Sequence, residues 1–256
     1  MDRVKEIIIK VIPASIANPF VKKHHYSGKV VANSNLHFGA FLDGKLHGVL
    51  SYGSSMDKRK TMQLIEGTGW NEFLELNRMA FDDYLPRNAE SFCIARTIKM
   101  IKKQAPQIKW IISFADGCSC GDGTIYRASN FVLTGIKENK TIILMPNGDK
   151  IADLNLNLQL KSVKDKYDKM CGLDPLVMHR ASDYVRGGAQ KLSGYQLRYV
   201  YFIDPAYKSK LTVPILPFSK IDELGAGMYK GENVTQESRH TKCEAQLARE
   251  ASKPLK

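Results

Sequence analysis

The sequence lacks the features of membrane and secreted proteins. No stretch of its 256 residues approaches the roughly 18 consecutive apolar residues that a membrane-spanning helix needs. The apolar run near the N-terminus is too short and too close to acidic residues for a signal peptide. The five cysteines are an odd number without regular spacing, which argues against a disulfide-stapled scaffold and predicts thiols. We therefore expect a cytoplasmic protein without membrane contacts.

Acidic residues are also scarce relative to basic ones. The chain has 38 lysines and arginines against 26 aspartates and glutamates, a formal net charge of +12. A field of this sign attracts polyanions and steers them in from solution, so nucleic acid is the first partner to consider. The alternative is a basic surface that only aids solubility. The content of 43% hydrophobic and 25% charged residues is that of an ordinary globular protein.

Alternating apolar residues predict most of the strands. Residues 36–53 contain two such runs separated by Asp43-Gly44, a strong signal for a tight hairpin. A largely continuous apolar run at 109–115 is typical of a central strand covered on both faces. The other predicted strands are 5–12, 73–81, 141–145, 196–203 and 212–216.

Helical periodicity appears in three places. Ile94, Ile98 and Ile101 define an amphipathic helix over 89–104, and a short helix is predicted at 124–130. Residues 161–191 are lysine-rich and poor in strand formers, which indicates a helical insertion. We expect one domain over residues 1–231 and a loosely ordered polar tail over 232–256.

Two candidate sites follow the strand predicted at 109–115. Asp116 stands where that strand ends, and ligands of open α/β sheets bind beyond the carboxyl ends of strands. The alternative is that Asp116, followed by Gly117, only stabilises a turn by hydrogen bonding to the backbone. Next, Gly121 and Gly123 precede a helix start whose amides can receive an anion, with Tyr126 on the first turn. That phenol can relay a proton or bond a base edge, or it can simply pack.

Two further groups lie earlier in the chain. Arg78 sits in an otherwise apolar strand, and a buried guanidinium needs an anion from the protein or from a phosphate. Ser91, in PRNAES at 86–91, either lines a pocket or caps the following helix. Lys22 and Lys23 precede His24 and His25, so basic side chains that can hold phosphates lie beside imidazoles that can act as bases or metal ligands.

Other histidines and cysteines give weaker signals. His37 and His47 lie on the two arms of the predicted hairpin and are expected to be structural. Cys118 and Cys120 have no second cysteine pair at ligand spacing, which argues against a metal site there.

With these motifs in place, the chain resembles the Mom family of phage DNA-modification proteins over most of residues 20–231. The matching segments, in order, are HHYSG at 24–28, FGAFLDGKLHGVLSYG at 38–53, ELNRM at 75–79, PRNAES at 86–91, KWIISFADG at 109–117, GDGTIYRASNF at 121–131, and RYVYFID followed by VPILPFSKI.

The resemblance implies a fold related to the Gcn5-type acetyltransferases, an α/β fold with a mixed, mostly antiparallel sheet flanked by helices. It also implies conversion of adenine in DNA to an N6-carbamoylmethyl form that shields phage DNA from host restriction. The implied partner is double-stranded DNA containing adenine. We expect cytoplasmic action in the bacterial host.

The resemblance also assigns roles to matching residues. The implied catalytic residues are Asp116, Tyr126 and His25, with Tyr26 or Tyr52 as a further functional tyrosine. The implied cofactor-binding residues are Arg78, Ser91, Asn88 and Arg87. Lys22, Lys23 and Arg127 are the candidate DNA-binding residues, and His25 is a candidate metal ligand.

The cofactor is less closely defined. Acetyltransferases of this fold hold the coenzyme A pyrophosphate in a glycine-containing loop, and PRNAES lacks those glycines. The product carries its acetamido group through the methylene carbon, whereas an acyltransferase would join it through the carbonyl. Acetyl-coenzyme A is one candidate, and iron, with which the family has been associated, is another.

Adenine N6 is a poor nucleophile that must lose a proton as a bond forms, so a carboxylate is expected, here Asp116, which would act as the base or orient N6. The base would be flipped out of the duplex. Two other functions stay open at this point: an acetyl-coenzyme A-dependent transferase acting on protein or small molecules, and a non-catalytic DNA-binding protein.

Overall fold

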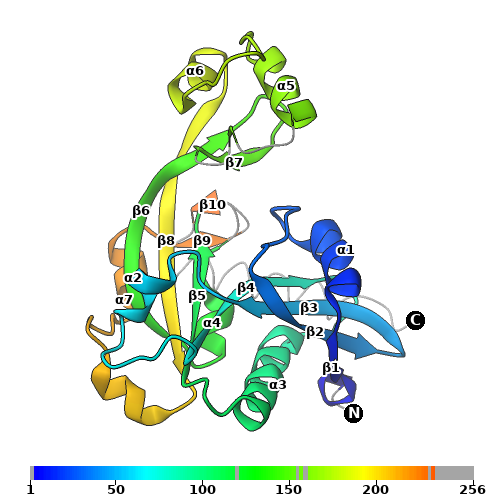
Figure 1. Cartoon of the computed structure of the whole chain (residues 1–256), viewed down its shortest axis with the longest axis vertical. Coiled ribbons are helices and arrows are strands. Elements are labelled where there is room, and N and C mark those ends of the chain that lie inside the picture. The colour runs from blue at the N-terminus through cyan, green and yellow to red at the C-terminus, as the bar shows by residue number, and fades with distance from the viewer. Residues whose placement is uncertain (1–2, 119–120, 154–155, 158–160, 230–231, 234–256) are drawn as a thin grey trace, which may run out of the picture. The chain divides into compact units, whose positions relative to one another are not determined.

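The computed structural model describes the chain except residues 1–2, 119–120, 154–155, 158–160, 230–231 and 234–256. Its main sheet has the strand order β1-β2-β3-β4-β5-β8-β6-β7 (Figure 1). The strands are β1 (Ile8–Ile12), β2 (Ser34–Leu42), β3 (Lys45–Gly53), β4 (Phe73–Phe81), β5 (Trp110–Asp116), β6 (Val132–Leu144), β7 (Lys150–Ala152) and β8 (Gln190–Phe202). A second, two-stranded sheet pairs β9 (Met228–Tyr229) with β10 (Glu232–Asn233).

The helices are distributed along the whole described chain, and none in the described part is long and apolar enough to cross a membrane. The α-helices are α1 (Ala14–His24), α2 (Lys58–Met62), α3 (Ala89–Gln104), α4 (Thr124–Ala128), α5 (Lys161–Met170), α6 (Ala181–Arg186) and α7 (Ser219–Glu223). The 3₁₀ helices with described bounds include η1 (Arg3–Glu6) and η3 (Pro205–Lys210).

The expected mixed, mostly antiparallel sheet is confirmed. β1, β2, β3 and β4 pair antiparallel in sequence, as do β6 and β7, whereas β4 and β5 pair in parallel. The predicted hairpin is also confirmed, because Asp43 and Gly44 both adopt positive φ angles, 51° and 75°, between β2 and β3. Such angles match the twist of the flanking strands.

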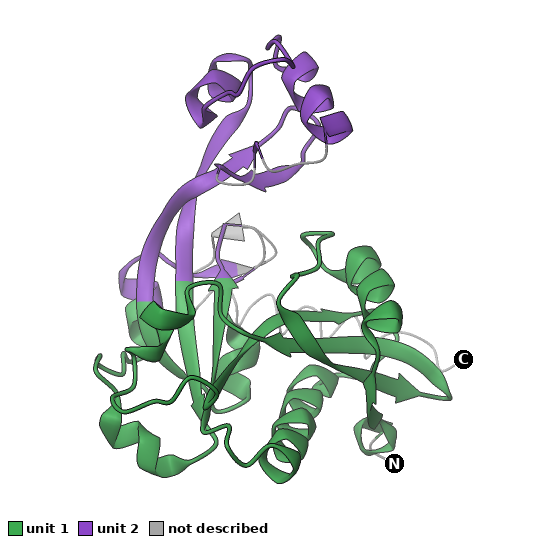
Figure 2. Ribbon diagram, viewed as in Figure 1, with its two compact units in different colours: residues 1–115, 123–135, 197–220 green, residues 116–122, 136–196, 221–256 purple. Residues whose placement is uncertain are grey.

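The chain divides into two compact units (Figure 2). Unit 1 comprises residues 1–115, 123–135 and 197–220, and unit 2 comprises residues 116–122, 136–196 and 221–256. Each has its own apolar packing. In unit 1, α1 packs on β2, β3 and β4, and a core cluster includes Phe73 and Trp110, whose rings stack at 4.5 Å.

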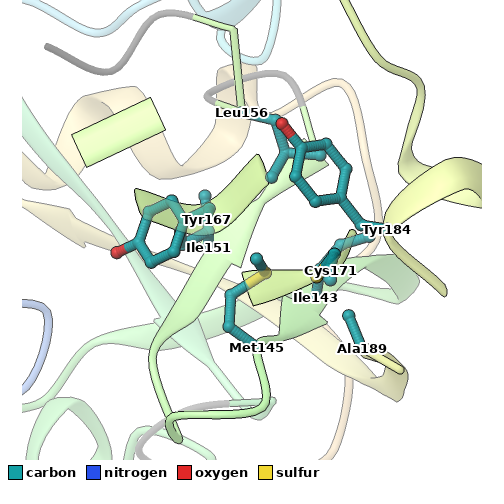
Figure 3. Packing of buried hydrophobic residues seen from close by; sticks show 8 residues of the cluster. All are labelled: Ile143, Met145, Ile151, Leu156, Tyr167, Cys171, Tyr184 and Ala189. Carbon is teal, nitrogen blue, oxygen red and sulfur yellow. The ribbon is translucent and has the colours of Figure 1, made fainter. Parts of the chain in front are cut away.

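Unit 2 has a separate core built from β6, β7, α5 and α6. Figure 3 shows its cluster of Ile143, Met145, Ile151, Leu156, Tyr167, Cys171, Tyr184 and Ala189. The two helices lie within the predicted helical insertion. An insertion that buries its own apolar residues has an internal source of stability.

Several predicted boundaries were wrong. The strand predicted at 5–12 begins only at Ile8, after η1. No strand forms at 212–216, where Leu216 makes one isolated bridge to Leu133, because Pro214 and Pro217 lack the N–H donors that a ladder needs. β6 begins at Val132 instead of residue 141, and β8 at Gln190 instead of 196. The tail predicted over 232–256 lies outside the described residues, apart from β10.

Candidate functional site

His25 is fixed at the end of α1. Its backbone N–H donates to the carbonyl of Val21 over 2.9 Å, and its ring Nδ1 accepts from the N–H of Ser27 over 3.1 Å. Burial, together with the nearby positive charge of Arg78, lowers the pKa of His25 from 6.5 to about 4. The ring is therefore neutral at pH 7, with its hydrogen on Nε2. Tyr26 lies against it, with 4.2 Å between ring centroids.

Arg78 is held on β4 by two hydrogen bonds. Its Nε donates to the carbonyl of Lys29 over 3.0 Å and its Nη1 donates to the carbonyl of Asn77 over 2.7 Å. Burial lowers the pKa of Arg78, while Tyr26, Glu75 and Tyr126 act in the opposite direction. The guanidinium thus lies within electrostatic reach of a carboxylate, two phenols and the imidazole of His25.

A β-bulge explains why Glu75 and Arg78 interact. In the β3–β4 ladder Ser51 pairs with Arg78 but the next residue, Tyr52, pairs with Leu76, so Asn77 is the extra residue. A bulge breaks the strict alternation of side chains and re-aims them, so residues three apart can share a face. Glu75 has a raised pKa, mainly because it is buried, which the hydrogen bond with Ser55 and the charge of Arg78 oppose.

Tyr126 is positioned by the glycine turn before α4. Its N–H donates to the carbonyl of Gly123 over 2.9 Å, and its ring lies 5.3 Å from that of Tyr199. Gly123 has a φ of +82°, and a Cβ there would approach the Tyr199 ring to 2.4 Å, so this turn requires glycine. Tyr126 acts electrostatically on both Arg78 and Tyr52.

Tyr52 is a buried member of this cluster. Its hydroxyl lies 2.7 Å from Oγ1 of Thr97, which itself donates to the carbonyl of Ile94. Because the hydroxyl proton of Thr97 is donated to Ile94, the Tyr52 hydroxyl is the donor in its hydrogen bond with Thr97. Burial raises the pKa of Tyr52 far above its usual value. The hydroxyl therefore stays protonated at neutral pH.

The start of α3 carries the expected cofactor residues. Asn88 is the N-cap residue in a left-handed conformation, φ 66°, and its side chain makes no capping bond. Ser91 is not the cap: it lies three residues later and its hydroxyl donates to the carbonyl of Asn88 over 3.1 Å. Arg87 is exposed beside them. The N–H of Ala89 already donates to the carbonyl of Pro86.

Asp116 is the last residue of β5 and belongs to unit 2. Its Oδ1 accepts from the N–H of Cys118 over 3.0 Å, a hydrogen bond typical of an Asp that stabilises a turn. Burial, with Asp116 as a second cause, raises the pKa of the Cys118 thiol to about 12. Lys150 donates to the carbonyl of the same cysteine over 3.3 Å.

The expected DNA-binding residues lie on two helices of unit 1. Lys22 and Lys23 are exposed in the last turn of α1, directly before His25 in sequence. Arg127 follows Tyr126 on α4, where its Nη2 donates to Oγ1 of Thr124 over 2.7 Å.

The two histidines of the hairpin, His37 and His47, have structural partners. His37 lies 2.8 Å from the Ser51 hydroxyl, and His47 lies 2.9 Å from the carboxylate of Asp82. Cys93, Cys118 and Cys171 are free thiols, as predicted, whereas Cys120 and Cys243 lie outside the described residues. Within the described ranges, no three His, Cys, Asp or Glu side chains are grouped so that they could hold a metal ion.

Unit 1 thus brings together five of the predicted site residues, His25, Tyr26, Tyr52, Arg78 and Tyr126. Sequence reasoning missed Glu75 as a member. In a regular strand, residues three apart face opposite ways, so only the bulge, which no spacing signals, places Glu75 with Arg78.

Comparisons with known proteins give two kinds of match. The model of the Mom protein family matches residues 6–220. The methylcarbamoylase Mom of Escherichia phage Mu is 28% identical over 211 residues, which cover 82% of this chain and 81% of that protein.

Solved structures that resemble the chain include acetyltransferases. A Bacillus subtilis acetyltransferase in complex with CoA has a TM-score of 0.43 and 11% identity, covering 77% of this chain and 98% of its own. The ribosomal-protein-S18-alanine N-acetyltransferase of Escherichia coli has a TM-score of 0.42 and 10% identity. The match covers 77% of this chain and 94% of that acetyltransferase.

Proposed function

The chain belongs to the Mom protein family, and from that membership we infer that it is an enzyme that converts adenine in double-stranded DNA to N6-carbamoylmethyladenine. The related phage Mu protein is a methylcarbamoylase. The observation that carries the proposal to this chain is the clustering of His25, Tyr26, Glu75 and Tyr126 around Arg78 in unit 1. The modification would protect phage DNA from restriction in the host cytoplasm.

The reaction joins N6 of adenine to the methylene carbon of a carbamoylmethyl donor. That carbon carries a leaving group, which departs with the bonding electron pair as the N6–carbon bond forms. The proton on N6 passes to a base. The donor is therefore an alkylating reagent in chemical class, and an acyl donor such as acetyl-coenzyme A would give a different linkage.

Arg78 is proposed to hold the anionic part of the donor. Its two backbone hydrogen bonds use two of five N–H donors and fix the plane of the guanidinium. Because the group is largely buried, an anion beside it would be held strongly. Ser91, Asn88 and Arg87, at the start of α3, are proposed to contact the donor as well.

His25 is proposed to donate a hydrogen bond instead of accepting a proton. Its Nδ1 already accepts from Ser27, so the ring offers Nε2–H. A neutral imidazole with this tautomer suits a carbonyl oxygen of the donor or a ring nitrogen of adenine. Tyr26 and Tyr126 would position the extruded base by stacking and hydrogen bonding.

Two carboxylates are candidates for accepting the N6 proton. Asp116 ends the central strand β5, and Asn at this position could keep the bond to the Cys118 amide while losing the charge. Glu75 lies in the cluster of unit 1, and its raised pKa makes it a stronger base than an exposed glutamate. We propose Asp116 as the base and Glu75 as the partner that orients Arg78.

Neither suspected cofactor matches a group of residues in the described structure. Iron needs several ligands, and the described residues contain no group of three His, Cys, Asp or Glu at ligand spacing. PRNAES lacks the glycines that cradle a pyrophosphate, and the first helix amide is already bonded to Pro86. We therefore assign no step to either group.

The basic charge supports DNA as the substrate, and Lys22, Lys23 and Arg127 are proposed to contact phosphates. The decisive experiment is mass spectrometry of nucleosides from the DNA of cells that express the chain. We expect an adenosine with one added carbamoylmethyl group. The control is an Arg78→Met variant expressed at the same level. Unmodified adenosine under confirmed folded expression would rule out the proposed activity.

A further inference from the structure

Three consecutive apolar side chains are exposed between α5 and α6 in unit 2. Leu176 is 85% exposed, Val177 49% and Met178 79%. Single exposed apolar residues are normal on any protein surface, but contiguous ones mark interaction sites. These three residues, the apolar tip, therefore require an explanation beyond the stability of the fold.

The backbone of the apolar tip is held on both sides. Nζ of Lys164 donates to the carbonyl of Val177 over 2.9 Å, and the N–H of Leu176 donates to Oδ1 of Asp174 over 2.9 Å. Nδ2 of Asn157 donates to the carbonyl of His179 over 3.0 Å. A loop held in this way presents its side chains without a large loss of conformational entropy on binding.

The supporting lysine is itself anchored in the core of unit 2. Nζ of Lys164 lies 2.5 Å from Oδ2 of Asp168, whose side chain is fully buried. The other carboxylate oxygen of Asp168, Oδ1, accepts a hydrogen bond from the hydroxyl of Tyr184 over 2.5 Å. Tyr184 belongs to the cluster in Figure 3. The tip therefore rests on a connected polar network inside an apolar core, and its shape depends on that network.

The surroundings of the tip are basic. Three of its acidic residues are engaged locally: Asp168 with Lys164, Asp174 with the backbone of the tip, and Asp183 with Arg186 and the N–H of Arg180. A fourth, Asp165 on α5, has one carboxylate oxygen buried without a hydrogen-bond partner among the described residues. The exposed basic residues of the same segment are Lys161, Lys166, Lys169, Arg180, Arg186 and Lys191. Apolar side chains surrounded by basic ones complement duplex DNA, because the basic side chains can contact the phosphates on its outside while the apolar side chains contact the stacked bases inside.

We propose that the apolar tip inserts between stacked base pairs of the DNA substrate while the surrounding lysines contact the phosphates. The proposal rests on the proposed function for the identity of the partner. Leucine and methionine are among the side chains that wedge base steps apart in DNA-bending proteins. Opening a step also lowers the energy needed to extrude a base from the stack.

The test uses the full chain with Leu176→Ser and Met178→Ser combined. Affinity for a duplex is measured by fluorescence anisotropy at several salt concentrations. We expect at least a tenfold loss of affinity at every salt concentration, with the slope of log K against log salt unchanged, because apolar contacts release no counterions. The contrasting variant, Lys166→Ala with Lys169→Ala, should reduce the magnitude of that slope by up to about 1.8.

Two controls accompany these variants. Ile8→Ser with Val11→Ser removes two other exposed apolar side chains, from the edge strand β1 of unit 1, and should not change DNA affinity. Met178→Leu keeps an apolar side chain and should retain binding. A duplex containing 2-aminopurine should gain fluorescence when the wild-type chain unstacks it, and not with the serine variant.

Unchanged affinity of the folded serine variant, or a change of slope like that of the lysine variant, would overturn the inference. So would loss of self-association, or of binding to anionic vesicles, without loss of DNA affinity. If the tip variant loses DNA binding but the wild-type chain leaves adenosine unmodified, the proposed function fails and the inference on the tip stands.

Discussion

Nε of Arg78 lies 3.0 Å from the backbone carbonyl of Lys29, so a strand of the sheet is tied to the loop that follows His25. The bond fixes the relative position of the imidazole and the guanidinium. Both are largely removed from solvent, and the charge of Arg78 contributes to the low pKa of His25. The site in unit 1 is therefore organised around this arginine.

Arg78→Lys should lower adenine modification at least about tenfold. Lysine keeps the charge but cannot bond two carbonyls in a fixed plane while also holding a donor anion. The matched control is Arg96→Lys, the same change at an exposed arginine of α3. Modified adenosine is measured by mass spectrometry at equal expression, and equal levels for both variants would contradict the role given to Arg78.

The low pKa of His25 predicts a pH effect on stability. The unfolded chain binds a proton near pH 6.5, whereas the folded ring binds one only near pH 4. Between these values protonation favours the unfolded state, so the stability that the neutral ring provides above pH 6.5 is lost as pH falls. The loss should reach about 2 kcal/mol at pH 5. Denaturant unfolding at pH 7 and pH 5 measures it.

In His25→Asn this part of the pH dependence should disappear. If the wild-type chain and the variant lose the same free energy of unfolding between pH 7 and pH 5, then His25 does not cause the pH dependence. Ring signals of His25 that titrate near pH 6.5 in the folded protein would also contradict this account.

The tyrosines of the cluster should behave differently from one another. Tyr52→Phe removes a buried donor to Thr97 and should cost about 1 kcal/mol of stability while modification continues. Tyr26→Phe and Tyr126→Phe should reduce modification with little change in the thermal midpoint. Loss of activity in Tyr52→Phe, with a normal midpoint, would transfer the functional role to Tyr52.

Much of the fold was predictable where local patterns and tertiary packing agree. The strand Phe73–Phe81 and the helix Ala89–Gln104 have the predicted bounds. Helix α1 was missed because Pro19 lies inside it and reads as a helix breaker. The helix forms because Ala17 and Val21, one turn apart, are buried against the sheet.

The site was predictable only in part, because tertiary features decide it. Motifs identified Arg78 and Tyr126 as candidates, but not the bulge at Asn77 that brings Glu75 beside the guanidinium. The first half of β6 was likewise hidden, since Gly135 and the polar residues 137–140 read as a loop. There Arg198 donates to the carbonyl of Thr134 over 2.7 Å, and a Cβ at position 135 would approach its guanidinium to 3.2 Å, which favours Gly135.

The two candidate bases can be separated by isosteric changes. Asp116→Asn should lose at least about 10²-fold in rate, the low end for removal of a general base, with a normal thermal midpoint. DNA affinity should survive. Glu75→Gln should lose less, because its proposed role is to orient Arg78. Rates are compared on the same duplex with purified chains, and near-normal modification by Asp116→Asn would remove that residue from the mechanism.

The buried network of unit 2 gives the last prediction. Asp168→Ala leaves the ammonium of Lys164 and the hydroxyl of Tyr184 without their shared carboxylate, and breaking a buried pair costs about 3–5 kcal/mol. The matched control is Glu138→Ala, which removes an exposed pair with Lys140 in the same unit and should cost less than about 1 kcal/mol. Hydrogen exchange should accelerate in α5 and α6 of the first variant and stay unchanged in the control. Because Lys164 also holds the carbonyl of Val177, DNA affinity should fall as well. Protected amides in α5 and α6 of Asp168→Ala would show that the network does not hold the unit together.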